Sequence, residues 1–180
     1  MSIGDADRKV LIADAAIDVL GRDGLRSLTH RAVDARAGLP QGTCSYHHRT
    51  RRSLLAAALN RIADLDRADT APAPAGDVLD QAVAVLGRWL GPGRVRTRAR
   101  LVLMLDAEAR RDLGDEAARL AGDFVPKATT TIGDARKARL LVALLDGVVA
   151  DDLIRGTDDP PSPGDLRARV AAVFTAVSAA

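Results

Sequence analysis

The chain has 180 residues, of which 47% are hydrophobic and 28% are charged, and its net charge is only +2. These proportions are ample for a packed core and exclude a disordered chain, and the length suits one domain or a small domain fused to a larger one. Apolar runs such as residues 140–145 are far shorter than the ~18 residues that cross a bilayer, so we expect no membrane partner.

Helical periodicity dominates the N-terminal part of the chain. Apolar side chains recur at intervals of three and four residues from Ile12 to Leu20, which predicts an amphipathic first helix that ends at Gly24. A short second helix follows and reaches residue 35 or 36, with Ser27 or Thr29 as its N-cap. No segment shows the strict alternation of apolar and polar residues that indicates a strand.

A turn and two further helices complete this part. Gly38 supplies the turn, and Pro40 is predicted to open the third helix, where its missing N–H costs nothing. Residues 51–69 are predicted to form a fourth, longer helix. Two short helices on either side of a glycine turn are typical of a helix-turn-helix, which places its second helix in the DNA major groove.

The remainder of the chain is also predicted to be helical. Two prolines and a glycine in residues 70–76 mark a linker, after which four or five helices follow. We therefore predict an all-α fold with an N-terminal three-helix DNA-binding domain and a C-terminal helical bundle. The predicted domains are residues 1–50 for DNA binding, 51–69 as a connecting helix, and 70–180 for effector binding and dimerisation.

The last two predicted helices are apolar over a wide arc. An arc that one packing partner cannot cover indicates burial on two sides, so we expect these helices to form a homodimer. The predicted interface consists of apolar residues from both helices: Leu141, Leu145, Val148, Val149, Val170, Phe174 and Val177.

The segment around the glycine turn is rich in groups suited to DNA. Residues 26–52 carry six arginines and one aspartate, whereas residues 70–180 carry fifteen basic and fifteen acidic side chains. A compact basic patch on a neutral body is typical of phosphate contact, although a solvated arginine face has the same charge pattern. Arg49, Arg51 and Arg52 precede or begin the fourth helix, whose N-terminus also favours an anion.

A series of short motifs runs through the N-terminal third of the chain: Ala15-Ala16, Gly24, Leu28-Thr29-His30-Arg31, Ala37-Gly38, Gly42-Thr43, Tyr46-His47 and Leu54-Leu55. In these motifs the chain resembles the TetR family of bacterial transcriptional regulators. It implies base contacts from four residues: Gln41, Gly42, Thr43 and Ser45. It implies phosphate or sugar contacts from five others: Thr29, Arg31, Tyr46, His47 and Arg51.

Three positions depart from the family pattern. His48 replaces the usual aromatic or aliphatic residue, Arg51 replaces the customary lysine, and Cys44 replaces a larger apolar residue. The first of these substitutions leaves the packing of the third helix open. Beyond Thr70 the resemblance is loose, although residues 140–156 are similar to the penultimate, dimer-forming helix of many members.

Other interpretations of these residues remain to be weighed. All three histidines lie between His30 and His48, but no carboxylate or cysteine cluster completes a metal site, so we expect neither metal nor cofactor. Cys44 can be read as a redox switch or as a small core residue. Asp106 and Glu108 do not face one another on a helix, and no nucleophile accompanies them, so we expect no enzyme.

The C-terminal domain offers a few large or polar side chains for a small-molecule effector. Candidates for the effector pocket are Trp89, Met104, Asp106, Phe124 and Asp146, although core packing or solvation also explains them. Only four aromatic residues are present, which favours an aliphatic or amphipathic effector over a flat aromatic one.

Taken together, these features predict a cytoplasmic regulator. The first nine residues lack the apolar stretch of a secretory signal, and the single cysteine suits a reducing compartment. We expect a homodimer that binds double-stranded DNA at a palindromic operator and acts as a repressor, released by a small molecule. The alternatives are a DNA-binding regulator whose C-terminal region only dimerises and, more remotely, an all-α enzyme or adaptor.

Overall fold

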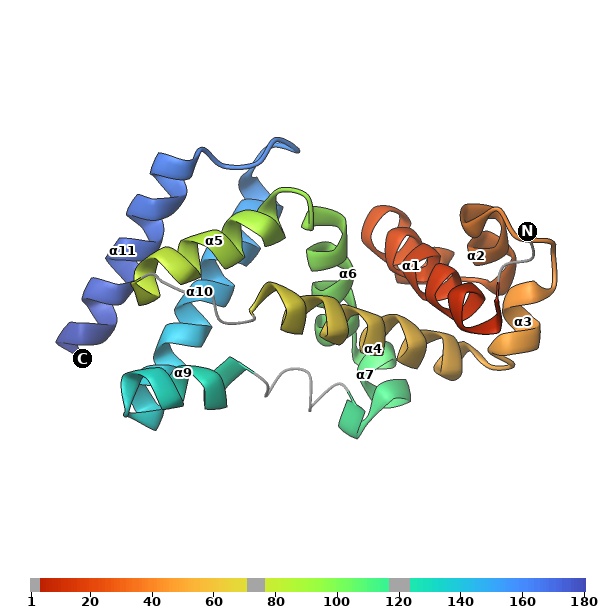
Figure 1. Cartoon of the computed structure of the whole chain (residues 1–180), viewed down its shortest axis with the longest axis horizontal. Helices are drawn as coiled ribbons and strands as arrows, with labels where there is room; N and C mark the ends of the chain where they lie inside the picture. Colours follow the sequence, from red (N-terminus) through yellow and green to blue (C-terminus); the bar gives the residue numbers. More distant parts are fainter. Residues whose placement is uncertain (1–3, 71–76, 117–123) are drawn as a thin grey trace. The chain divides into compact units, whose positions relative to one another are not determined.

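The computed structural model describes residues 4–70, 77–116 and 124–180, and all regular elements in these ranges are helices (Figure 1). The all-α prediction is thus confirmed. Within the same ranges, no helix is long and apolar enough to cross a membrane. The chain packs as two units, Met1–Ala68 with Val95–Leu120, and Asp69–Arg94 with Ala121–Ala180.

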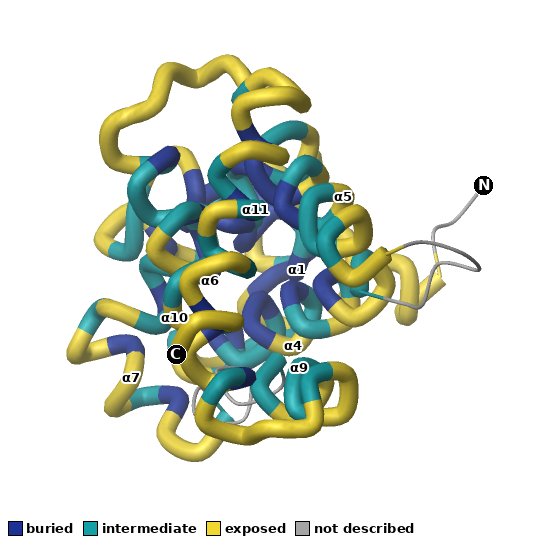
Figure 2. The backbone as a smooth tube through the Cα atoms, turned by 90° about the vertical axis from the view of Figure 1, so that its left-hand side faces the viewer, coloured by how far each residue is buried: buried dark blue, intermediate teal, exposed yellow. Residues whose placement is uncertain are grey.

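The first unit contains the N-terminal helices and two later ones. Its elements are α1 (Asp5–Asp23), the 3₁₀ helix η1 (Leu25–Ser27), α2 (His30–Ala37), α3 (Thr43–His47), α4 (Arg51–Asp69), α6 (Arg94–Leu105) and α7 (Ala107–Leu113). The middle and C-terminal turns of α1 are buried, as the dark tube in Figure 2 shows. Ile12 and Ala16 of α1 join Leu55 and Ile62 of α4 in a core where each is 0% exposed.

The predicted boundary at residue 70 does not coincide with these packing units. Leu103 of α6 and Leu113 of α7 are fully buried in the same core as the N-terminal helices. Gly21 of α1 allows close packing of this kind, because a Cβ atom there would lie 2.1 Å from the carbonyl oxygen of Val95. Sequence periodicity identifies an apolar helix face but not the core into which it packs.

Local signals determine the ends of the N-terminal helices. The Thr29 side chain accepts a hydrogen bond from the Ala32 N–H (3.1 Å), so Thr29 rather than Ser27 is the N-cap of α2. Gly38 ends α2 in the left-handed conformation (φ 65°), which glycine adopts without strain. The expectation for Pro40 is wrong: α3 begins at Thr43, and the Pro40 carbonyl accepts from the Thr43 N–H (3.1 Å) in the turn before it.

The second unit is built from α5 (Val78–Leu90), α9 (Phe124–Ile132), α10 (Ala135–Arg155) and α11 (Pro163–Ala179). Leu86 and Leu90 of α5 pack with Val149 of α10 and Val170 of α11 in its core. Arg94, the first residue of α6, belongs to this unit, where its guanidinium donates to the Asp152 carboxylate at 2.7 Å in a buried ion pair.

Candidate functional site

The turn before α3 and the helix itself present polar groups to solvent. Gln41, Gly42 and Ser45 are exposed, and the Tyr46 side chain is among the most exposed large groups, at 78%. The Thr43 hydroxyl donates to the Pro40 carbonyl (2.7 Å), which orients that side chain. The four side chains or backbone positions predicted to read bases therefore lie together on one short segment. Their contact with DNA remains a prediction.

A buried carboxylate holds the start of this segment. Asp34 of α2 is 3% exposed, and its two carboxylate oxygens accept hydrogen bonds from the Gly42 and Cys44 N–H groups, each at 2.7 Å. In the sequence, Asp34 stands out only as the single acid of the basic segment. Its role depends on a contact across the turn, which helical periodicity within α2 does not reveal.

Arg51 is not placed for the phosphate contact that the resemblance implies. Its guanidinium donates to the Leu28 carbonyl at 2.6 Å and to the Leu25 carbonyl at 2.9 Å, within the part of the fold that precedes α2. Both terminal nitrogens of the side chain thus bind the protein's own backbone. These two bonds give Arg51 a structural role in the domain, while its positive charge stays in place.

His47 is likewise turned into the protein. Its side chain is only 5% exposed, with Nδ1 3.5 Å from a carboxylate oxygen of Asp5. Its ring packs edge-on against Tyr46, with 5.1 Å between the ring centroids. Tyr46 is therefore the accessible member of the predicted Tyr46–His47 pair in this conformation.

Four other arginines of the basic segment are available to an anion. Arg26, Arg31, Arg49 and Arg52 are all exposed, and none of them forms an ion pair or a side-chain hydrogen bond within the described part of the chain. Arg36, in contrast, is engaged by Asp18 and by Asp23 (2.8 Å). Arg31 lies in the first turn of α2 and Arg52 in the first turn of α4, where free backbone N–H groups also favour an anion.

The three histidines do not converge on a metal. His30 Nε2 donates to the His48 carbonyl at 2.6 Å, and burial lowers the pKa of the His48 imidazole below its ordinary value. Among the described residues no cluster of metal-ligating side chains is present. The His30 contact ties the start of α2 to the residue after α3, which is a structural role.

Cys44 is a core residue in this structure. It is 0% exposed, and burial, with a smaller effect of the Asp34 carboxylate, raises the pKa of its thiol to about 11. The thiolate is the form that oxidises readily, so a buried thiol with this pKa is a poor redox sensor at neutral pH. The geometry favours the interpretation of Cys44 as a small hydrophobic residue.

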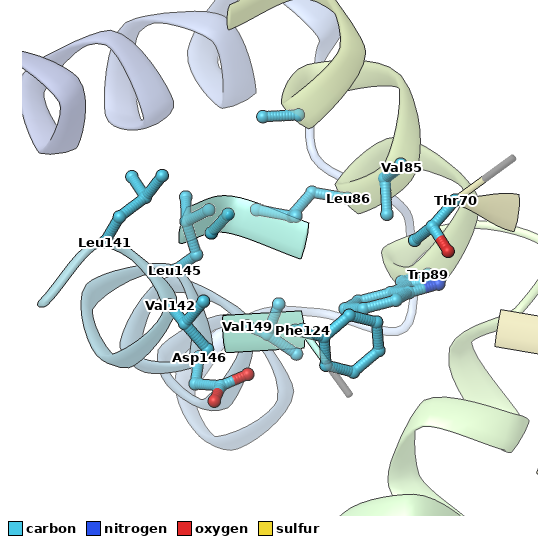
Figure 3. Close-up of a pocket in the computed structure, with 12 residues that line it drawn as sticks. Thr70, Val85, Leu86, Trp89, Phe124, Leu141, Val142, Leu145, Asp146 and Val149 are labelled. Atoms are coloured by element: carbon cyan, nitrogen blue, oxygen red, sulfur yellow. The ribbon is translucent and has the colours of Figure 1, made fainter. Parts of the chain in front are cut away.

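The second unit contains a cavity of about 150 Å³ between α5, α9 and α10 (Figure 3). Trp89 and Phe124 line it and pack edge-to-face, with ring centroids 5.3 Å apart. Leu86 and Leu145 contribute to an almost wholly apolar wall, and the exposed Asp146 places a carboxylate beside it. A wall of this kind suits an apolar molecule or the apolar part of a larger one.

Two of the five residues predicted for an effector pocket lie elsewhere. Met104 and Asp106 belong to the first unit, and neither lines the cavity. Asp106 is the N-cap of α7, where its carboxylate accepts from the Glu108 and Ala109 N–H groups, each at 2.9 Å. Neither residue shares this cavity with Trp89, and the polar residue that interrupts the apolar run at Asp106 marks a helix cap.

The residues predicted for a dimer interface are largely buried within their own protomer. Exposure is 0% for Val170, 1% for Val149 and 5% for both Leu141 and Val177, so a partner could cover little more of them. The other three are half-buried, and all three pack against the core of the second unit: Leu145, Val148 and Phe174. One reason for the wide apolar arc of α10 is that Leu141, Leu145 and Val149 line the cavity.

Other positions on α10 and α11 are exposed and apolar or small. On α10 they include Leu140 (38% exposed), Ala143, Gly147 and Ile154 (77% exposed). On α11 they are alanines: Ala168, Ala172 and Ala176. These positions recur at helical intervals, so each set lies along one side of its helix.

Comparison with known proteins places this architecture among regulators. A family model described as tetracyclin repressor-like, C-terminal domain, matches residues 73–179. The multidrug binding protein EbrR in complex with ethidium is 30% identical over 92% of this chain and 98% of that chain, with a TM-score of 0.69. A TetR family member from Streptomyces coelicolor A3 is 31% identical over 94% and 98% of the two chains, with a TM-score of 0.75.

A third structure, of a TetR-family transcriptional regulator from Rhodococcus sp., is 24% identical over 96% of this chain and 98% of that chain, with a TM-score of 0.73, and supports the fold. No curated protein matches the chain. The similarity to EbrR and to the Streptomyces coelicolor protein covers both units described above.

Proposed function

The chain belongs to the TetR family of transcriptional regulators, and from that premise we propose that its first unit binds a palindromic DNA operator as part of a homodimer. The observation that supports this most directly is the exposed polar segment at α3, flanked in the sequence by four arginines without ion-pair partners in the described chain. Gln41, Gly42, Thr43 and Ser45 would contact bases. Phosphates and sugars of the DNA backbone would be contacted by Thr29, Arg31 and Tyr46, together with Arg26, Arg49 and Arg52.

The partner subunit would pack on the exposed sides of α10 and α11. Small side chains such as Gly147 and Ala172 allow two helices to approach closely, and Leu140 and Ile154 offer apolar area that the protomer leaves uncovered. Two-fold symmetry would then place the two α3 segments on half-sites about one helical turn, or a multiple of it, apart.

The cavity of the second unit would hold an effector that releases the operator. Structures of the relative EbrR contain bound ethidium, proflavin or malachite green. A compact amphipathic molecule with a ring-sized apolar body and a cationic end fits the apolar wall, the two aromatic rings and the Asp146 carboxylate. Release requires that such a ligand bind one conformation of the dimer better than the other.

Selection of genomic fragments by the purified full-length protein at ~150 mM salt tests the proposal, because non-specific phosphate binding is weak there. We expect enrichment of one palindromic site, protected in footprinting over two half-sites. Repression is then tested with a reporter placed behind that site. If no sequence is enriched from either freshly purified or refolded protein, which carries no ligand over from the cell, the proposed function is wrong.

A further inference from the structure

The two hydrogen bonds of the Asp34 side chain join one helix to the start of the next. The carboxylate comes from the middle of α2, and the N–H groups of Gly42 and Cys44 belong to the start of α3. The Asp34 backbone takes part as well, because its carbonyl accepts from the Leu39 N–H at 2.9 Å. One residue therefore binds the turn and the proposed reading helix at three points.

The start of α3 needs such a partner. A helix of five residues is too short to be stable alone, and its first N–H groups have no acceptor within the helix. Its N-cap is Gly42, which has no side chain to supply an acceptor. The Asp34 carboxylate therefore performs, from the preceding helix, the function of an N-cap side chain, and it does so with two oxygens.

The charge of Asp34 has a cost that this geometry must offset. A buried carboxylate is expensive unless hydrogen bonds satisfy it, and the described part of the chain gives it no ion pair with a cation. A negative charge next to a DNA-reading segment also repels phosphates. Any favourable contribution of Asp34 to DNA binding must therefore come from orientation and not from charge.

We propose that Asp34 is the positioning residue of the DNA-reading segment: it fixes the direction of α3 relative to α2, and thereby the sequence specificity of the protein. The proposal rests on the proposed function of α3. Asp34 itself touches no base. It acts through the backbone of Gly42 and Cys44, which carries Gln41, Thr43 and Ser45 to their places.

Two substitutions separate geometry from charge. Asp34→Asn keeps the shape, but its amide can accept only one of the two N–H groups and turns a donor toward the other. Asp34→Glu keeps the charge and adds one methylene to a buried site. Both variants are expected to bind the selected operator about tenfold or more weakly, which corresponds to the loss of one charge-assisted hydrogen bond.

Binding to an unrelated duplex should stay the same for Asp34→Glu and stay the same or increase for Asp34→Asn, which removes a negative charge. Asp7→Asn, an exposed site on α1, controls for the charge, and Ile62→Val, in the core, controls for lost stability. Both controls should bind the operator like the wild type. The proposal is overturned if Asp34→Asn binds the operator like the wild type. It is also overturned if Asp34→Asn loses as much affinity for unrelated DNA as for the operator, or if Ile62→Val loses as much operator affinity as Asp34→Asn.

Amide hydrogen exchange of the free wild-type protein provides a second measurement that needs no variant to fold. The Gly42 and Cys44 amides should be protected, and exchange at unprotected rates would overturn the proposal. Binding of the wild type to its operator is measured in the same series. If the wild type selects no operator, the proposed function itself fails. If the wild type binds and Asp34→Asn binds equally well, only the proposal for Asp34 fails.

Discussion

The Arg51 guanidinium donates to the Leu28 carbonyl oxygen at 2.6 Å, and its second terminal nitrogen donates to the Leu25 carbonyl at 2.9 Å. The Leu25 carbonyl belongs to η1 and the Leu28 carbonyl to the residue that follows it, both in the connection between α1 and α2. Arg51 at the start of α4 therefore holds the entrance of the helix-turn-helix in place, and the adjacent Arg52 is free to meet a phosphate.

Arg51→Ala should lower the free energy of unfolding of the first unit by about 2 kcal/mol, because two carbonyls lose a charged donor. The slope of DNA affinity against salt concentration should not change. Arg52→Ala is the matched control, since it should flatten that slope by about one unit and leave the melting temperature unaltered. Thermal unfolding and salt-dependent fluorescence anisotropy measure the two effects, and a flattened slope in Arg51→Ala would contradict the assignment.

Gly21→Ala should destabilise the first unit strongly. The added Cβ would lie 2.1 Å from the Val95 carbonyl oxygen, and backbone on both sides would have to move. Gly87→Ala in α5 is the control, because its Cβ meets nothing nearer than 3.7 Å and alanine favours a helix by about 1 kcal/mol over glycine. Urea unfolding should show a lower midpoint for the first variant and an equal or higher one for the second. Equal midpoints would show that α1 and α6 do not pack this closely.

Gly147→Arg tests the proposed dimer surface. A Cβ at Gly147 meets nothing within 4 Å in the protomer, so a large side chain should not disturb its fold, whereas it would block the middle of the exposed side of α10. We expect sedimentation of this variant as a monomer with unchanged helix content. Ala107→Arg, an exposed site on α7, should remain dimeric. A dimeric Gly147→Arg would move the interface to another surface.

The only tryptophan of the chain lines the cavity, so its fluorescence reports on ligands there. Titration of the DNA-free protein with benzyltrimethylammonium, a compact cation with a single ring, should change Trp89 emission and saturate. Asp146→Asn should weaken binding up to about fivefold, as expected for a partly solvated ion pair. Asp134→Asn, the N-cap of the same helix, loses the same charge and should leave binding of this cation unchanged. If the wild type and Asp146→Asn bind the ligand with equal affinity, the Asp146 carboxylate takes no part in the site.

The raised pKa of Cys44 predicts a specific pH dependence. The thiol has an ordinary pKa of 9.0 and about 11 in the folded protein, so the unfolded chain loses its proton first as the pH rises. The unfolded state then binds fewer protons than the folded state, and stability should fall between about pH 9 and pH 11. Cys44→Ala should lose this part of the alkaline decline in urea unfolding. Rapid alkylation of native protein at pH 7.5 would contradict the burial of the thiol.

Features that depend on residues within one turn of helix can be predicted from the sequence. The apolar repeat of α1, the Thr29 cap, the Gly38 terminus and the polar residues from Gln41 to Ser45 all depend on neighbours three or four positions away. The all-α class and the family follow from such local patterns, and both are confirmed. A local pattern does not tell where a long side chain ends, and so Arg51 and His47 were assigned to DNA although the protein itself binds them.

Only the tertiary structure decided which apolar faces meet and which polar groups they enclose. Val170 and Val149 have the periodicity of an interface, but α5 and the rest of the second unit already cover them, whereas Ile154 stays exposed. In the sequence Asp34 is the one acid of a basic segment, whereas in the structure it holds the start of α3, because the turn brings the Gly42 and Cys44 N–H groups to its carboxylate. The physical reason is the same in both cases: burial and hydrogen-bond partners are set by contacts between residues on different helices, and a sequence pattern records only the positions within one helix.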